Sequence, residues 1–235
     1  MRKTSCELCT NVNCFVKMYC SPEWIHKISL SKSQVYFKQN QEIIKEGELV
    51  LGMFFIQQGK VKVVSTGLDG RQQIVRFAND GHILGHRGLG YERYPISAVA
   101  MEGSLVCFVV NDLLSEVFMA NPKLSMGLMV FYSRELRKIE TRMKNIAHMN
   151  LREKVAEALL LMMEMFGLNK EHELNVPFTR EDIASTVGTN VEQISRQLTE
   201  FESAKLIQKR GRKVVILKKA GLEHIISKHF MQYAK

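Results

Sequence analysis

Four cysteines lie within the first twenty residues of the chain, and thiolates at this density could hold a metal centre. Cys6 and Cys9 form a C-x-x-C pair, Cys14 follows five residues later, and Cys20 lies six residues beyond that. Two cysteines spaced in this way can direct their thiolates at one metal centre, and further cysteines can complete its ligand set. The spacing alone leaves three alternatives open: an iron–sulfur cluster, a zinc site, or thiols without a ligand.

A second set of polar residues lies near the carboxyl terminus, where Glu192, Ser195 and Arg196 fall at or near the open face of a predicted helix. An arginine can donate two hydrogen bonds to guanine, and a glutamate can accept one from the cytosine amino group. Each such contact contributes about 1 to 3 kcal/mol of discrimination between bases. Ser195 could add a weaker contact to a base or a phosphate. The set therefore indicates sequence-specific binding to double-stranded DNA.

Two short helices must position these side chains. Thr179 and Asp182 have the spacing of a capping box, and Gly188 is expected to end the first helix. Asn190 is the predicted N-cap of the second helix. The apolar face of the first helix comprises Ile183, Ala184 and Val187, and that of the second comprises Ile194, Leu198 and Phe201.

Two β-rich stretches follow, residues 206–209 and 213–217, and Arg210-Gly211-Arg212 joins them. The glycine permits a tight hairpin between two cationic side chains, which is typical of a wing that contacts phosphate. Residues 179–217 are therefore predicted to form a winged helix-turn-helix, and the competing interpretation is a small structural domain without a DNA partner. The residues predicted to contact DNA are Thr179, Arg180, Asn190, Val191, Glu192, Ser195, Arg196, Arg210, Arg212 and Lys213.

A long helix is predicted from about Pro122 to His148, and its apolar residues recur at steps of three and four, as in a heptad repeat. The members of this apolar seam are Met129, Tyr132, Leu136, Ile139, Met143 and Ile146. The seam could pack against its own domain or against a second copy of the chain. We favour the second copy, because a two-fold homodimer places two DNA-binding helices about 34 Å apart in successive major grooves of an inverted repeat.

Between about Gln34 and Val110 the pattern changes to short β-type runs separated by glycines. The runs are residues 43–44, 53–56, 61–65, 73–77, 97–101 and 105–110. Leu68-Asp69-Gly70 is a predicted hairpin turn. Many short strands with frequent glycines indicate an antiparallel roll of two sheets.

The composition suits two modest domains and an anionic partner. The chain has 235 residues, 46% of them hydrophobic, with a formal net charge of +9 and a pI near 9.3. No apolar run reaches the roughly 18 residues that cross a bilayer, and residues 1–6 lack the apolar core of a signal peptide. We therefore expect a cytoplasmic protein with no membrane partner. Five cysteines, an odd number in a reducing compartment, argue against a disulfide framework.

The segment Val191-Glu192-Gln193-Ile194-Ser195-Arg196 resembles the V-E-x-x-S-R recognition-helix signature of the FNR branch of the CRP/FNR family of bacterial transcription regulators. Gly59, with Phe55-Ile56 before it and Val61-Lys62-Val63 after it, is similar to the family's F-x-I-x-x-G-x-V strand pair. The resemblance implies base contacts by the glutamate, serine and arginine, a homodimer, and contact with RNA polymerase.

The resemblance also implies an α+β fold. Its parts are a cysteine-rich arm, an antiparallel β-roll effector domain of the cyclic-nucleotide-binding, jelly-roll type, a long dimerisation helix and a carboxy-terminal winged helix-turn-helix. In this chain they correspond to residues 1–21, 22–118, 119–149 and 150–235. The last part is expected to begin a new helix near Asn150.

The segment Cys6-Glu7-Leu8-Cys9, together with Cys14, is similar to the FNR-type cluster arm, in which three amino-terminal cysteines and a distant fourth hold a four-iron, four-sulfur (4Fe-4S) cluster. Cys107 stands where the family places the distant cysteine, although a lone cysteine in a strand is also a common buried side chain. The resemblance implies an oxygen or redox sensor. Better-known members have five residues between the second and third cysteines, whereas residues 10–13 supply four. The expected ligands are Cys6, Cys9, Cys14 and Cys107, and because of this departure Cys20 is a substitute for one of them.

Other effectors and another class of protein are alternatives. Cyclic-nucleotide sensors of the family have G-E-L followed by R-S-A, whereas Gly85-His86-Arg87 and Ile96-Ser97-Ala98 lack both charged anchors, and Arg87 or Arg93 could compensate only in part. Haem bound through His82 or His86, or a regulator without a cofactor, are further alternatives. A cysteine-dependent metal oxidoreductase would be an enzyme, but the sequence has no paired carboxylates, nucleophile elbow or metal–histidine motif.

Overall fold

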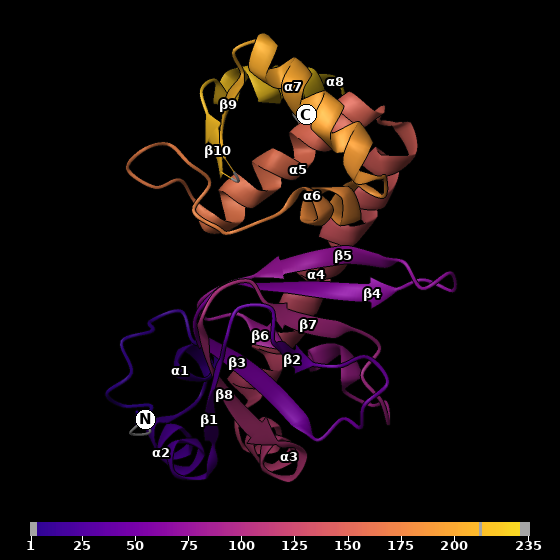
Figure 1. The fold of residues 1–235 in the computed structure, drawn as a ribbon. Coiled ribbons are helices and arrows are strands. Elements are labelled where there is room, and N and C mark those ends of the chain that lie inside the picture. Colours follow the sequence, from indigo (N-terminus) through magenta and orange to yellow (C-terminus); the bar gives the residue numbers. More distant parts are fainter. Residues whose placement is uncertain (1–3, 212, 231–235) are drawn as a thin grey trace. The chain divides into compact units, whose positions relative to one another are not determined.

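The computed structural model describes residues 4–211 and 213–230, which form two compact units (Figure 1). The first unit comprises residues 1–71 and 75–136 as far as they are described, and the second comprises 72–74 and 137–235. The sequence-based boundaries at residues 21, 118 and 149 remain predictions. Within the described residues, no helix has the length and apolar character to cross a membrane.

The amino-terminal unit contains two four-stranded antiparallel sheets, as the glycine-punctuated β-runs predicted. The first sheet has the order β1 (Ser33–Phe37), β8 (Ser104–Val110), β3 (Gly52–Gln58) and β6 (Ile83–Leu84). The second has the order β2 (Glu42–Ile44), β7 (Ser97–Ala100), β4 (Val61–Thr66) and β5 (Gln72–Ala78). The sequence did not reveal β1 and β6. β1 has no buried residue and β6 has two residues, so neither carries a clear alternation of apolar and polar side chains.

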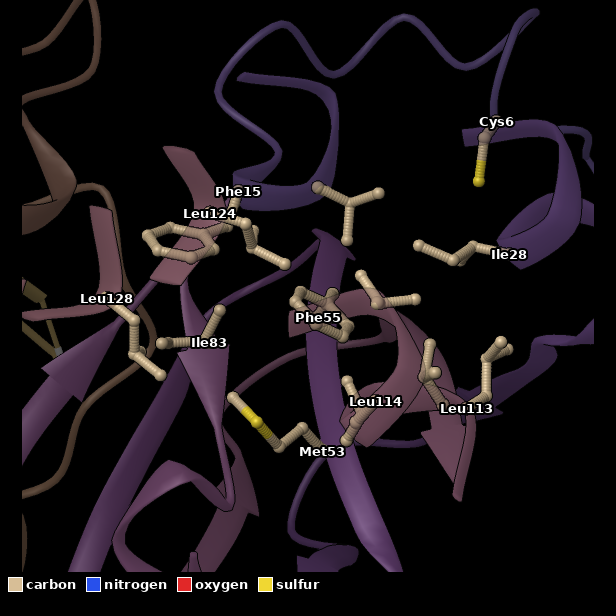
Figure 2. Close-up of a cluster of buried hydrophobic side chains, with 13 residues drawn as sticks. Cys6, Phe15, Ile28, Met53, Phe55, Ile83, Leu113, Leu114, Leu124 and Leu128 are labelled. Carbon is tan, nitrogen blue, oxygen red and sulfur yellow. The ribbon is translucent and has the colours of Figure 1, made fainter. Parts of the chain in front are cut away.

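Strand β3 is covered on both of its faces, which explains why it reads as a continuous apolar run. Successive side chains of a strand point to opposite sides. Ile56 lies in the core between the sheets, with Val61, Ala98 and Val106 among its neighbours in that cluster. Met53 and Phe55 belong instead to an outer cluster (Figure 2).

This outer cluster is built from segments that are far apart in the sequence (Figure 2). The short helix α1 (Phe15–Tyr19) contributes Phe15, and α2 (Pro22–Ser31) contributes Ile28. Leucines of α3 (Asn111–Ala120) and of the first turns of α4 (Pro122–His148) complete it. The cysteine-rich arm is therefore packed onto the roll.

The predicted long helix is confirmed as α4, Pro122–His148. The predicted seam residues Met129, Tyr132, Leu136, Ile139 and Met143 are exposed, and Ile146 is half-buried. These side chains therefore do not fill the core of their own chain. An exposed apolar stripe of this length is typical of an interaction surface.

The second unit contains the predicted helix-turn-helix and wing. α5 (Leu151–Phe166) begins at a capping box formed by Asn150 and Glu153, as expected for a new helix there. It is followed by α6 (Arg180–Val187), α7 (Val191–Ser203), β9 (Ile207–Arg210), β10 (Lys213–Ile216) and α8 (Lys219–Phe230). Helices α1, α2, α3 and α8 were not predicted from the sequence.

Candidate functional site

The capping interactions fix where the helices of the helix-turn-helix begin and end. The Thr179 hydroxyl oxygen accepts a hydrogen bond from the Asp182 amide at 3.1 Å, and the Asp182 carboxylate accepts one from the Thr179 amide at 2.8 Å. Gly188 ends α6 with a left-handed φ of 78°, which glycine adopts at little cost. The Asn190 side chain caps α7 by accepting from the Gln193 amide at 2.9 Å. These observations confirm the predicted capping pattern.

Helix α7 separates its apolar and polar residues as the sequence predicted. Ile194, Leu198 and Phe201 are buried. On the other side, Glu192 and Arg196 are exposed and form an ion pair of 2.6 Å with each other. An exposed ion pair of this spacing contributes only about 0.3–0.5 kcal/mol to stability. Contacts with bases can therefore replace the contact between Glu192 and Arg196 at little cost. Ser195 is half-buried, and its hydroxyl donates to the Val191 carbonyl at 2.9 Å.

The wing is an antiparallel hairpin in which Arg210 lies opposite Lys213. Its turn contains Gly211, whose φ is 61°, while Arg212 lies outside the described residues. The Lys213 ammonium pairs with the buried Glu173 carboxylate at 2.6 Å. This hydrogen bond raises the pKa of Lys213 and lowers that of Glu173. A phosphate contact by Lys213 would therefore compete with a partner in its own unit.

A groove connects the helix-turn-helix to the wing. It is lined by residues at the start of α6, by apolar residues of α7, and by the wing cations Lys209 and Lys213. Arg180 and Asn190 are exposed, and Val191 is half-buried. The arrangement presents a helix surface and positive charge together, which is what a DNA groove and its flanking phosphates require.

The cysteines form a second candidate site. Cys6, Cys9 and Cys14 from the arm and Cys107 from β8 line a single cavity, although 93 residues separate Cys14 from Cys107 in the chain. Apolar walls come from Ile28, Phe55 and Val109. Cys20 does not line this cavity, and burial raises the pKa of its thiol to about 12. Among residues 4–211 and 213–230, no group of three or more His, Cys, Asp or Glu residues has the arrangement of a site for a single metal ion.

Specific hydrogen bonds hold the cysteine-bearing arm against the roll. The Asn11 side-chain amide donates to the carbonyls of Ile56 and Gln57 at 3.2 and 2.8 Å. The Cys6 amide donates to the Ser29 hydroxyl at 2.8 Å, and the Lys17 ammonium donates to the Cys9 carbonyl at 2.7 Å. Asn11 thus anchors the four-residue loop between Cys9 and Cys14 to strand β3.

The cavity is suited in its chemistry to a metal–sulfur group. Sulfur donors surrounded by apolar walls are typical of iron–sulfur sites. Burial raises the pKa of the Cys14 and Cys107 thiols, so metal binding must release their protons. Two lysines, Lys17 and Lys32, also line the cavity. Sequence analysis missed both lysines, because neither stands in a motif with the cysteines.

Several polar groups in the region of the nucleotide and haem alternatives form contacts within the amino-terminal unit. His86 is buried within a short 3-10 helix, His86–Gly88, and its backbone carbonyl accepts from the Tyr132 hydroxyl. Arg76 forms an ion pair of 3.1 Å with Glu135 of α4, and both side chains are largely buried. Ser97 uses its hydroxyl to accept from the Glu46 amide. The His86 carbonyl, the Arg76 guanidinium and the Ser97 hydroxyl are thus engaged in contacts within the fold.

Comparisons with known proteins agree with this architecture. Residues 34–121 match the cyclic nucleotide-binding domain family, and residues 153–225 match the Crp-like helix-turn-helix domain family. The chain belongs to the CRP/FNR family of transcription regulators. Members of the CRP/FNR family bind DNA and are not enzymes, so the oxidoreductase alternative is wrong.

Individual CRP/FNR relatives cover most of the chain. The transcriptional activator protein FnrA of Stutzerimonas stutzeri is 27% identical over 79% of this chain and 77% of its own. The fumarate and nitrate reduction regulatory protein of Vibrio cholerae is 25% identical over 89% of this chain and 87% of its own. The structure of FixK2 from Bradyrhizobium japonicum, at 23% identity, has a TM-score of 0.73 over 83% of this chain and 96% of its own, and supports the fold.

Proposed function

We propose that this CRP/FNR regulator acts as a homodimer that senses oxygen or redox state through a 4Fe-4S cluster held by Cys6, Cys9, Cys14 and Cys107. One observation supports the sensor above all: cysteines from the arm and from strand β8 line the same apolar cavity. When bound, the cluster supplies an oxygen-labile metal centre. The protein supplies the sulfur donors, excludes water with its apolar walls, and holds the arm through Asn11.

In the DNA-binding unit, we assign base contacts to Glu192 and Arg196 and a weaker contact to Ser195. Arg180, Arg210 and Lys213 would bind phosphate, and Thr179, Asn190 and Val191 would lie close to the DNA backbone. The support is the exposure of the Glu192–Arg196 pair on α7 and the cationic wing opposite the start of α6. Phosphate contacts fix the register of the protein on the duplex, and base contacts give the sequence preference.

The apolar seam on α4 is the proposed dimer interface. All of its members except the half-buried Ile146 are exposed within one chain, so a second copy would cover apolar surface that water otherwise contacts. A two-fold dimer would present two α7 helices to inverted half-sites, and RNA polymerase is the expected further partner.

A contiguous set of aromatic contacts links the cysteine cavity to α4. Phe15, directly after Cys14, has its ring 6.4 Å from that of Phe131, and the Tyr19 ring lies against Gly127. A shift of the arm on cluster loss would therefore displace groups that touch the seam helix. A coupling free energy of about 1–3 kcal/mol would change the affinity for DNA roughly 5- to 150-fold.

Anaerobic purification with iron and sulfide analysis tests the sensor. We expect a brown protein with about four iron and four sulfide per chain. A colourless anaerobic preparation with less than about one iron per chain would refute the cluster and leave the DNA-binding assignment untouched.

Gel-shift titration tests the DNA partner independently. The probe is an inverted repeat of TTGAT and ATCAA half-sites, and the control is the same duplex with both half-sites scrambled. We expect the dimer to prefer the intact repeat. Equal affinity for the two duplexes would contradict sequence-specific binding to this site.

A further inference from the structure

Lys32 is a buried lysine whose partner is a cysteine sulfur. It follows the last residue of α2, and only 3% of its surface is exposed. Its ammonium donates to the Cys107 sulfur at 3.6 Å, and Cys6 lines the same cavity. In the described part of the chain, Lys32 forms no ion pair with a carboxylate. Its charge is therefore directed at the sulfur atoms of the cavity.

A buried ammonium without an anionic partner is costly, and lysine is almost never fully buried unless it is paired. Neutral thiols are weak acceptors and return little of that cost. Four thiolates around an iron–sulfur core would instead carry a net negative charge, because their charges exceed that of the core. The position of Lys32 thus suits a cavity whose occupant is an anionic metal–thiolate group.

The second lysine of the cavity differs in its partner. The Lys17 ammonium donates to the backbone carbonyl of Cys9, at 2.7 Å, and so holds the arm rather than a sulfur atom. Lys17 and Lys32 therefore form a matched pair for comparison: both are cations that line the cavity, but Lys32 contacts a cysteine sulfur whereas Lys17 contacts a backbone carbonyl.

We propose that Lys32 is a charge-compensating and positioning residue of the cluster site, which donates a hydrogen bond to the sulfur of Cys107 and raises the reduction potential of the bound cluster. The proposal rests on the proposed function, since it presupposes the cluster. The relevant couple is the gain of one electron by the cluster, with no bond formed or broken. The added negative charge is stabilised by a nearby ammonium, and hydrogen bonds to the sulfurs are among the factors that set such potentials.

Anaerobic redox titration of the full chain with dithionite tests this role, with the visible absorption of the cluster as the readout. Lys32→Met removes the charge and keeps an unbranched side chain that is one atom shorter. It should make reduction less favourable by about tenfold or more, which for one electron is about 59 mV toward lower potential. Lys32→Arg should stay close to wild type, and Lys17→Met should shift the potential less than Lys32→Met.

The outcomes separate this proposal from the sensor itself. A wild-type chain without iron and sulfide would refute the proposed function and this proposal with it. A loaded wild type whose potential matches that of Lys32→Met would overturn the role of Lys32 alone. Cluster binding by Lys32→Arg but not by Lys32→Met would support the need for charge. Loss of the cluster in both variants would show that the shape of the lysine matters instead, and would also overturn the proposal.

Discussion

The buried His86 ring should make the amino-terminal unit lose stability in mild acid. The ring packs edge-on against Phe131 and Tyr132 of α4, and its Nδ1 atom has no hydrogen-bond partner. Burial first, and then the charges of Arg76 on β5 and Arg87 in the same turn, lower the pKa of His86 from 6.5 to about 3. Glu135 of α4 pairs with Arg76.

The lowered pKa of His86 determines how the stability of the fold changes with pH. The folded state disfavours the proton, so below pH 6.5 the unfolded chain binds it more readily. The stability associated with neutral His86 is complete above pH 6.5 and is lost as the pH falls from 6.5 toward 3. Proton linkage with these two pKa values gives a loss of about 2 kcal/mol between pH 7 and pH 5.

Urea unfolding at pH 7 and pH 5, followed by tryptophan fluorescence, measures this loss. Trp24, the single tryptophan, lies on α2 in the same unit as His86. His86→Leu has a similar volume and cannot bind the proton, so it should lose about 2 kcal/mol less than wild type. His148→Leu, at an exposed position, should retain the wild-type loss. Equal losses in wild type and His86→Leu would refute the reasoning.

Three further predictions concern the DNA interface, the seam and the cysteines. In gel-shift titrations, Glu192→Ala should reduce base discrimination by about 1–3 kcal/mol, whereas Lys213→Ala should weaken cognate and scrambled duplexes alike and lower the salt slope by about 1. Equal effects of Glu192→Ala on both duplexes would contradict its base contact. Leu136→Glu should yield monomers in analytical ultracentrifugation, because it places two carboxylates in an apolar seam; a persistent dimer would exclude the seam as the interface. Cys107→Ser should abolish the visible absorption of the anaerobic protein and preserve its circular dichroism. Cys20→Ser should preserve both signals. If instead Cys20→Ser abolishes the absorption and Cys107→Ser does not, Cys20 is the ligand and Cys107 is not.

The helix-turn-helix was predictable because its signals are local. A capping box joins Thr179 to Asp182, three residues away, and the apolar face of α7 repeats within a few turns. Such contacts arise between neighbours in the chain, so residue types and spacing are enough to place them. The short helices α1 and α3 escaped prediction because neither has a side-chain cap, and their burial depends on strands elsewhere in the sequence.

The sequence by itself therefore determined the helix limits around the DNA-binding surface, the long seam helix, the roll of short strands and the family. Only the tertiary structure decided that Cys107 faces the arm cysteines, that Cys20 does not line their cavity, and that Lys32 is buried on the Cys107 sulfur. Lys32 and Cys107 lie 75 residues apart in the chain. Their contact depends on how β8 pairs with its neighbours and how α2 packs on that sheet, and no spacing along the chain encodes that packing.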